Sequence, residues 1–178
     1  MAPAMALPNP AAPTAEMPDF TVLVREHQAM VFSLAQHFLG DRAAAEELAQ
    51  DVFMALYRHL GELQSPEHVL FWLRRVTANR CIDHARRRVR HPEVPLDKVP
   101  EPVASASAAD PLLSERLRSL VASLPEKARM IVVLRYQEDL DPGEIAQVMS
   151  MPLNTVKSQL HRALAMLREK AAGMELEK

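Results

Sequence analysis

Basic side chains without nearby acids mark the stretch NTVKSQLHRALAML, residues 154–167, which Arg168 follows. Lys157 and His161 are four residues apart and Arg162 comes next, so a helix would present all three on one side. No acid occurs until Glu169. Lys and Arg neutralise phosphates and can also donate to base edges. The stretch therefore favours contact with nucleic acid over the alternative, an ordinary solvated helix surface.

A denser basic cluster lies earlier, in residues 72–90. Its only acid is Asp83 against seven arginines, a net charge of +6. Such density is the electrostatic footprint of a protein that meets a polyanion, whereas a solvated face usually mixes in more acids. Phe71 and Trp72 precede the cluster, and aromatic rings can stack unpaired bases, although core packing is the simpler interpretation of Trp72. The arginines are Arg74, Arg75, Arg80, Arg86, Arg87, Arg88 and Arg90.

The segment DRAAAEELAQDVFMALYRHL, residues 41–60, has the opposite character. Glu46, Glu47 and Asp51 lie on and beside one face of the helix that it predicts. These acids either favour the N-terminal half of that helix or dock a positively charged protein surface. The formal net charge of −2 therefore hides two basic faces and one acidic face.

The sequence has no carboxylate pair, metal-ligand spacing, nucleophile triad or Gly-rich phosphate loop. We therefore expect no enzymatic activity, no metal and no cofactor. Cys81 is the only cysteine, which excludes an internal disulfide and a Cys-rich zinc site, and we interpret it as a packing residue. No apolar run approaches 18 residues and the N-terminus does not resemble a secretory signal, so we expect a cytoplasmic protein without membrane insertion.

Proline marks the boundaries of the elements that must position these residues. Five of the 14 prolines lie in residues 1–18 and four lie between 92 and 102. We interpret 1–18 as a disordered tail, 91–110 as an extended acidic linker and 174–178 as a second tail. Two small helical domains remain, at 19–90 and 111–173, and the fold class is all-α.

The first domain is predicted to contain three main helices. Residues 20–39 and 42–60 carry apolar stripes, separated by Gly40 and a capping Asp41. Ser65-Pro66 is a good helix start, so the Arg cluster belongs to a third helix. The expected buried side chains are Leu23, Met30, Val31, Leu34, Phe38, Leu48, Val52, Ala55, Leu56, Leu60, Val69, Leu73, Val76 and Ile82.

The second domain is predicted to end in a helix-turn-helix. Residues 141–149 form a short helix, SMPL breaks it, and Asn154 is expected to cap the helix that follows. The major groove admits one such helix. The helices before this motif are expected to bury Leu113, Leu117, Leu120, Val121, Leu124, Ala128, Ile131, Val132 and Leu134. The shared core of the helix-turn-helix is expected to contain Ile145, Met149, Leu153, Val156 and Leu160.

These pieces, in this order, resemble a bacterial RNA polymerase sigma factor of the extracytoplasmic-function (ECF, group 4) type over residues 20–172. The segment AEELAQDVFMALYRHL is similar to region 2.2 of that family, and FWLRRVTANRCIDHARRR is similar to regions 2.3–2.4. The segment LPEKARMIVVLRYQEDLDPGEIAQVMSMPLNTVKSQLHRAL is similar to region 4. The resemblance implies a factor that binds core polymerase and directs promoter recognition, −10 melting and transcription initiation.

The resemblance also implies roles for individual residues. Glu47, Gln50 and Asp51 would contact the β′ clamp helices, and the first part of region 4 would meet the β flap. Asn79 stands at the family's base pocket, where a flipped base of the −10 non-template strand is held. The −10 element would be contacted by Trp72, Arg75, Asn79, Arg80, Asp83, His84, Arg86 and Arg87. The −35 duplex would be contacted by Thr155, Lys157, Ser158, Gln159, His161 and Arg162.

An anti-sigma factor is a further expected partner, since such factors commonly hold members of this family. Two positions depart from the family pattern: Ser150 replaces a common Gly at the helix-turn-helix break, and Gln159 replaces a common Arg. The alternative function is a stand-alone helix-turn-helix regulator of duplex DNA. That alternative explains residues 111–172 but assigns nothing to the Arg cluster or the acidic helix.

Overall fold

The computed structural model describes residues 17–90 and 111–175, and in these ranges it contains only helices, turns and loops. The first set of helices is α1 (Phe20–Leu39), α2 (Arg42–His59), the short 3-10 helix η1 (Leu60–Glu62) and α3 (Pro66–Arg90). The second set is α4 (Pro111–Ala122), α5 (Glu126–Gln137), α6 (Pro142–Met149) and α7 (Leu153–Glu175). The all-α prediction is confirmed. The predicted linker and most of both predicted tails lie outside the described residues.

One glycine ends α1, and two short polar side chains begin α2 and α3, as predicted. The second helix was expected to reach residue 60, but α2 ends at His59 and η1 follows it. Gly40 adopts φ 68°, which places it in the left-handed region and ends α1. The Asp41 side chain then accepts a hydrogen bond from the Ala44 N–H at 3.2 Å, which caps α2. Ser65 Oγ accepts from the His68 N–H at 3.1 Å and caps α3.

The helix-turn-helix prediction is confirmed for α6 and needs a correction for α7. Asp141 and Glu144 form a reciprocal capping box at the start of α6. Asn154 is not the cap of α7, because α7 begins at Leu153 and the Pro152 carbonyl accepts from the Val156 N–H at 3.1 Å. Proline has no N–H to lose, so it starts this helix without an unpaired donor.

One apolar cluster runs through both sets of helices. It joins side chains of α1, α2 and α3 to Met130, Ile131 and Leu134 of α5, Ile145 of α6 and Val156 of α7. The predicted stripes supply most of it. Among the side chains that the structure describes, which exclude Leu113, two predictions are wrong: Leu117 is 56% exposed and Leu153 is 42% exposed. Leu117 lies on a side of α4 that no other described helix covers, and Leu153 is the first residue of α7.

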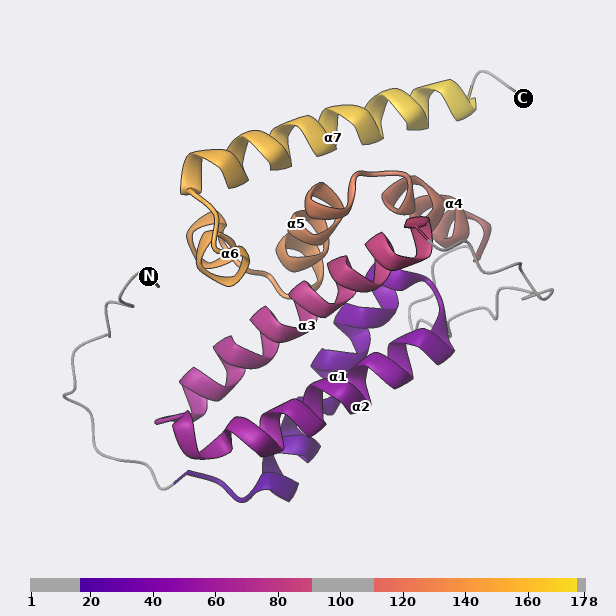
Figure 1. Ribbon diagram of the computed structural model, residues 1–178. Helices are drawn as coiled ribbons and strands as arrows, with labels where there is room; N and C mark the ends of the chain where they lie inside the picture. The colour runs from indigo at the N-terminus through magenta and orange to yellow at the C-terminus, as the bar shows by residue number, and fades with distance from the viewer. Residues whose placement is uncertain (1–16, 91–110, 176–178) are drawn as a thin grey trace.

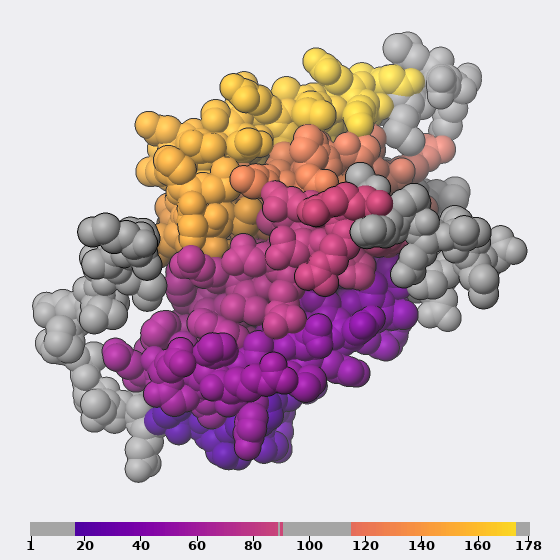
Figure 2. Space-filling view, in the orientation of Figure 1, coloured from indigo at the N-terminus to yellow at the C-terminus, as the bar shows by residue number. Residues whose placement is uncertain are grey.

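The long helix α3 lies between the other helices of the first set and the second set (Figure 1). On one side it packs against α1 and α2, and on the other against α5 and α6. Helix α7 covers the far side of α5 and α6 (Figure 1). The space-filling view shows the two sets meeting along α3 (Figure 2). The structure thus holds α3 and α7, the helices with the two basic stretches, on different faces of one body.

Candidate nucleic-acid and partner interfaces

The acidic face of α2 is exposed where the sequence places it. Glu47, Gln50 and Asp51 are all solvent-accessible. Glu46 pairs with Arg42 at 2.9 Å within the same helix, so its charge has a local role. The Asp51 carboxylate accepts from Arg80 of α3 at 3.3 Å. A residue predicted to contact polymerase therefore contacts a residue predicted to contact DNA.

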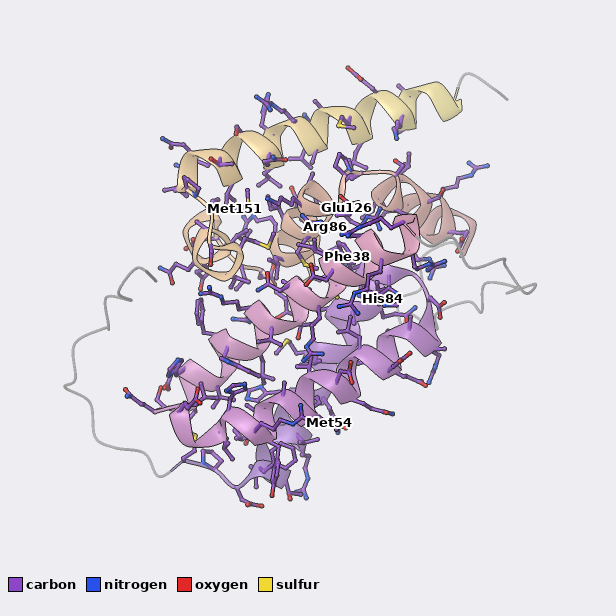
Figure 3. All side chains as sticks on the ribbon, in the orientation of Figure 1. Phe38, Met54, His84, Arg86, Glu126 and Met151 are labelled. Atoms are coloured by element: carbon purple, nitrogen blue, oxygen red, sulfur yellow. The ribbon has the colours of Figure 1, made fainter. Side chains whose placement is uncertain are left out.

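An apolar groove of about 1120 Å³ lies beside this acidic face, between α1 and α2. Phe20, Phe32 and Phe53 form part of its lining, with Gln50 at its edge. Met54 and Tyr57, also in the lining, are 55% and 69% exposed. Figure 3 places Met54 on the side of α2 away from the second set of helices. Sequence reasoning missed this groove, although large apolar residues outside the buried stripe were the available signal.

Helix α3 brings the predicted −10 residues onto two adjoining stripes. Arg75, Asn79, Asp83 and Arg86 follow each other at intervals of three or four residues, and Arg80, His84 and Arg87 do the same beside them. Asn79, Asp83, Arg86 and Arg87 are exposed, whereas Arg75, Arg80 and His84 are partly buried. The Asp83 and Arg86 side chains form a loose ion pair at 3.9 Å. This face can meet both the phosphates and the bases of one strand.

Trp72 lies at the start of this face and is partly buried against the apolar core. Its ring centroid lies 5.8 Å from that of His59, in a tilted arrangement. The structure therefore supports the packing interpretation of Trp72 and leaves only part of the ring accessible.

Arg74 does not belong to the exposed basic face. Its Nε and Nη2 atoms both donate to Glu138 at 3.2 Å, and the two side chains are only 21% and 10% exposed. Burial raises the pKa of the Glu138 carboxyl, and the nearby Arg74 charge opposes that rise. The charge pattern of the sequence groups Arg74 with the arginines predicted to bind a polyanion. In the structure Arg74 is mostly buried and pairs with Glu138, so it is not available for that role.

Helix α7 presents the predicted −35 residues on its outer side. Lys157, Ser158, His161 and Arg162 are exposed, and Thr155 and Gln159 are partly buried. The opposite side of α7 is anchored by Val156 and Ala163, which are buried. No other described residue forms an ion pair with Lys157, His161 or Arg162, so these groups can bind an outside anion. Met151 lies in the turn that joins α6 to α7 (Figure 3).

Cys81 has no catalytic environment. It is fully buried in the apolar cluster, and burial raises the pKa of its thiol to about 12. The thiol is therefore protonated at neutral pH and cannot serve as a nucleophile. Within residues 17–90 and 111–175, no group of three or more His, Cys, Asp or Glu side chains could hold a metal ion. None of the helices described is both long enough and apolar enough to cross a bilayer.

Comparison with known proteins shows which protein families these two sets of helices match. Residues 23–91 match the family model of sigma-70 region 2, and residues 114–167 match that of sigma-70 region 4. The RNA polymerase sigma-E factor of Streptomyces coelicolor is 30% identical over 162 residues, which cover 91% of each protein. The ECF RNA polymerase sigma factor SigE of Mycolicibacterium smegmatis is 34% identical over 164 residues, and the match covers 87% of this chain but 62% of that protein.

Solved structures show the same fold. The sigma factor RpoE of Bartonella quintana, in complex with the anti-sigma factor NepR, superposes with a TM-score of 0.70 at 19% sequence identity. The match covers 85% of this chain and 95% of that one. CnrH, in complex with the cytosolic domain of CnrY, gives a TM-score of 0.64 at 22% identity. The match to CnrH covers 86% of this chain and 88% of that one.

Proposed function

Because the chain belongs to the extracytoplasmic-function RNA polymerase sigma factors, we propose that it binds core polymerase and directs it to promoters with a −35 and a −10 element. It acts by recognition and DNA opening, without a catalytic site of its own. The family consists of transcription initiation factors, and we expect the chain to work in the cytoplasm, where its polymerase is found.

The −10 element is captured by the exposed face of α3. The exposure of Asn79 supports this proposal most strongly. Its amide lies on the same stripe of α3 as Arg75 and Arg86. An amide can donate to and accept from a base edge, and the guanidinium groups neutralise the phosphates beside it. Holding a flipped base offsets the few kcal/mol that unstacking costs.

The −35 element is read as duplex by α7. Lys157, His161 and Arg162 are exposed on the outer side of the helix, where the N-terminal half of a recognition helix reaches base edges. Gln159 is only partly accessible, and its side chain is shorter than that of the arginine common at this position. It therefore suits a base contact better than contact with a distant phosphate. Ser158 and Thr155 complete the face.

Core polymerase is bound by the acidic face of α2 together with the groove beside it. The groove supplies apolar area for a helix of the partner, and Glu47, Gln50 and Asp51 supply its polar rim. We assign this surface to the β′ clamp helices and the first part of the second helix set to the β flap. The solved structure of RpoE is a complex with the anti-sigma factor NepR, which supports an anti-sigma factor as a further partner of this chain.

A stand-alone regulator of duplex DNA is the alternative, and it would use α7 alone. It leaves the α2 groove and the exposed α3 face without a role, so we do not favour it.

Base capture by Asn79 can be tested with a promoter that carries 2-aminopurine in the −10 non-template strand. With core polymerase and this protein, the fluorescence should rise as the base leaves the stack. Asn79→Ala should weaken opening about tenfold, since contacts to one held base contribute on the order of 1–3 kcal/mol. Gln64→Ala changes an exposed amide outside α3 and is the matched control. Equal opening by the two variants would remove Asn79 from the base pocket.

A further inference from the structure

Two side chains in the first turn of α7 differ from the sequence prediction. The sequence predicts that Leu153 is buried and that Asn154 caps the helix. In the structure Leu153 is 42% exposed, and Asn154 is exposed as well. Both side chains are therefore accessible at the start of the helix that we assign to the −35 element.

Main-chain hydrogen bonds explain why the Asn154 amide is free. The Pro152 carbonyl accepts from the N–H groups of Thr155 at 2.9 Å and Val156 at 3.1 Å. A capping side chain accepts from the N–H two or three residues ahead of it, and the Val156 N–H is already bonded. In the part of the chain that the structure describes, the Asn154 side chain has no hydrogen-bond partner. Its amide therefore keeps both a donor and an acceptor for an outside group.

The turn before α7 fixes the position of this amide. The Met151 N–H donates to the Ala146 carbonyl of α6 at 2.9 Å, and the Met151 side chain packs against the apolar cluster. Pro152 then fixes its own φ angle through its ring. Because the main chain is already ordered, a contact by Asn154 costs little further conformational entropy.

Helix geometry directs Asn154 outward. With about 3.6 residues per turn, Val156 and Ala163 lie roughly 180–200° around α7 from Asn154. Both are buried, so Asn154 lies in the middle of the opposite, outer side. Lys157 and His161 follow it at intervals of three and four residues on the same stripe. Asn154 therefore extends the proposed −35 face to the N-terminal end of α7, the part of a recognition helix that reaches base edges.

The amide of Asn154 differs in chemistry from the cations beside it. Lys157 and Arg162 carry only donors, which match the two acceptors that guanine presents in the major groove. A side-chain amide carries donors and an acceptor together. Adenine presents the complementary pair, an amino donor and the N7 acceptor, so asparagine is suited to adenine.

Gln159 is the other side-chain amide of α7. It is partly buried, and it lies roughly 140° around the helix from Asn154 and roughly 7.5 Å further along. Base pairs are spaced about 3.4 Å apart along the duplex. The two amides would therefore face different base pairs, so their effects on sequence preference can be told apart.

Leu153 supplies an apolar surface next to the amide of Asn154. It lies four residues before Lys157, at the edge of the same face. Thymine alone carries a methyl group in the major groove, and apolar side chains recognise it. An amide suited to adenine and an adjacent side chain suited to thymine together favour A·T pairs.

We propose that Asn154 reads an adenine of the −35 element in the major groove and that Leu153 contacts a thymine methyl group beside it. The start of α7 thus adds a base-specific contact to the cationic face formed by Lys157, His161 and Arg162. This inference rests on the proposed sigma function and adds two residues to those assigned to the −35 duplex.

The main test is transcription by core polymerase and the full chain from a library in which each −35 position carries all four bases. Asn154→Ala should lose an adenine preference of about tenfold at one position and keep the preferences elsewhere, since one bidentate contact discriminates by about 5- to 150-fold. Gln64→Ala changes an exposed amide outside α7 and should keep every preference. The proposal is overturned if Asn154→Ala keeps all preferences, loses activity equally on all sequences, or keeps an adenine preference that Gln159→Ala loses.

Asn154→Asp tests whether the amide itself selects the base. A carboxylate only accepts hydrogen bonds, and it matches the amino group of cytosine. The variant should therefore shift the preference at the same position from adenine toward cytosine. A merely structural role of Asn154 would not change which base is preferred, so an unchanged adenine preference would overturn the proposal.

Deoxyuridine in place of thymine tests the contact by Leu153, because it removes only the methyl group. In the −35 element this change should reduce transcription with the parent about fourfold, the effect expected for one buried carbon group. It should have no further effect with Leu153→Ala. Equal losses for the two proteins would overturn the contact by Leu153.

Thermal unfolding separates base reading from helix capping. Asn154→Ala should melt no lower than the parent, because alanine favours the helix and no cap is lost. A fall of about 2–4 °C, as expected for loss of a cap, would show that the amide bonds to the main chain and would overturn the proposal. If the parent and core polymerase initiate at no promoter, the proposed function fails, and selection of the same duplex library by the chain alone still decides whether Asn154 reads adenine.

Discussion

Replacing Arg129 with alanine removes a donor that serves three main-chain carbonyls. Arg129 donates to the Phe38 carbonyl at 3.3 Å, to the Leu124 carbonyl at 3.2 Å and to the Ala122 carbonyl, and it stacks on the Phe38 ring. Burial lowers the pKa of the guanidinium, and Glu126 opposes that change. The group stays charged at any pH of interest because the ordinary pKa of arginine is so high.

The loss of stability follows from these contacts. A hydrogen bond to a charged group contributes about 1.5–3 kcal/mol, and a cation–π contact about 0.5–1 kcal/mol. Water can replace the donor at the exposed Ala122 end, so we expect a loss of about 4 kcal/mol, the low end for the two remaining hydrogen bonds and the cation–π contact. For a chain of this size that loss lowers the melting temperature by about 8–16 °C. Thermal unfolding followed by circular dichroism at 222 nm measures it.

Arg135→Ala is the control for this experiment. Arg135 lies in the same helix, but it donates to a single carbonyl, that of Leu140, at 3.0 Å. We expect a loss of about 1.5 kcal/mol, or about 3–6 °C. Arg129→Lys should fall between the two, because one ammonium cannot reach three carbonyls in the geometry of the guanidinium fork. If Arg129→Ala and Arg135→Ala melt at the same temperature, the account of the boundary between α1 and α5 is wrong.

Three further changes test other parts of the account. Arg162→Ala should reduce transcription about tenfold from promoters with a −35 element and leave promoters without one unchanged, whereas an equal loss on both would reject a specific role. Asp51→Arg should weaken core binding at least about tenfold, because it reverses a charge in the proposed interface and repels Arg80. Unchanged affinity in a direct binding assay would reject the assignment of Asp51 to this interface. Ser150→Gly should raise stability by about 1 kcal/mol, or about 2–4 °C, because Ser150 adopts the left-handed φ of 51°. Ser119→Gly, in the middle of α4, should instead lower the stability, because glycine is unfavourable inside a helix.

Local chemistry explains why the helix limits were predictable. Gly40, Asp41 and Ser65 act on backbone groups within a few residues, so their effect can be read from the chain alone. The Asp141-Pro142 start of α6 works in the same way. Asn154 misled the prediction, because Pro152 two residues earlier can also begin a helix.

Contacts between distant residues explain what was not predictable. Arg74 looks like a DNA contact by charge and position, and its role changes because Glu138 meets it from another set of helices. The single apolar cluster across both sets has the same cause, since a stripe of apolar residues does not specify which partner covers it. Leu117 and Leu153 have the expected spacing, but no neighbouring helix covers them.

The sequence predicted which helices expose the candidate residues, but not which other residues they contact. Asn79, Lys157 and Arg162 are exposed on the helices that the sequence indicated. The pairing of Asp51 with Arg80 joins two surfaces that the sequence treated separately. The groove beside Asp51 also required the packing of α1 against α2.

Run-off transcription with core polymerase and a library of genomic fragments measures directly whether this protein directs initiation at promoters. Core alone and core with the Asp51→Arg protein are the references. We expect initiation from a limited set of fragments that share a −35 and a −10 element, with little product in either reference. Failure to initiate on any fragment, together with tight binding of the protein to duplex DNA without polymerase, would contradict it.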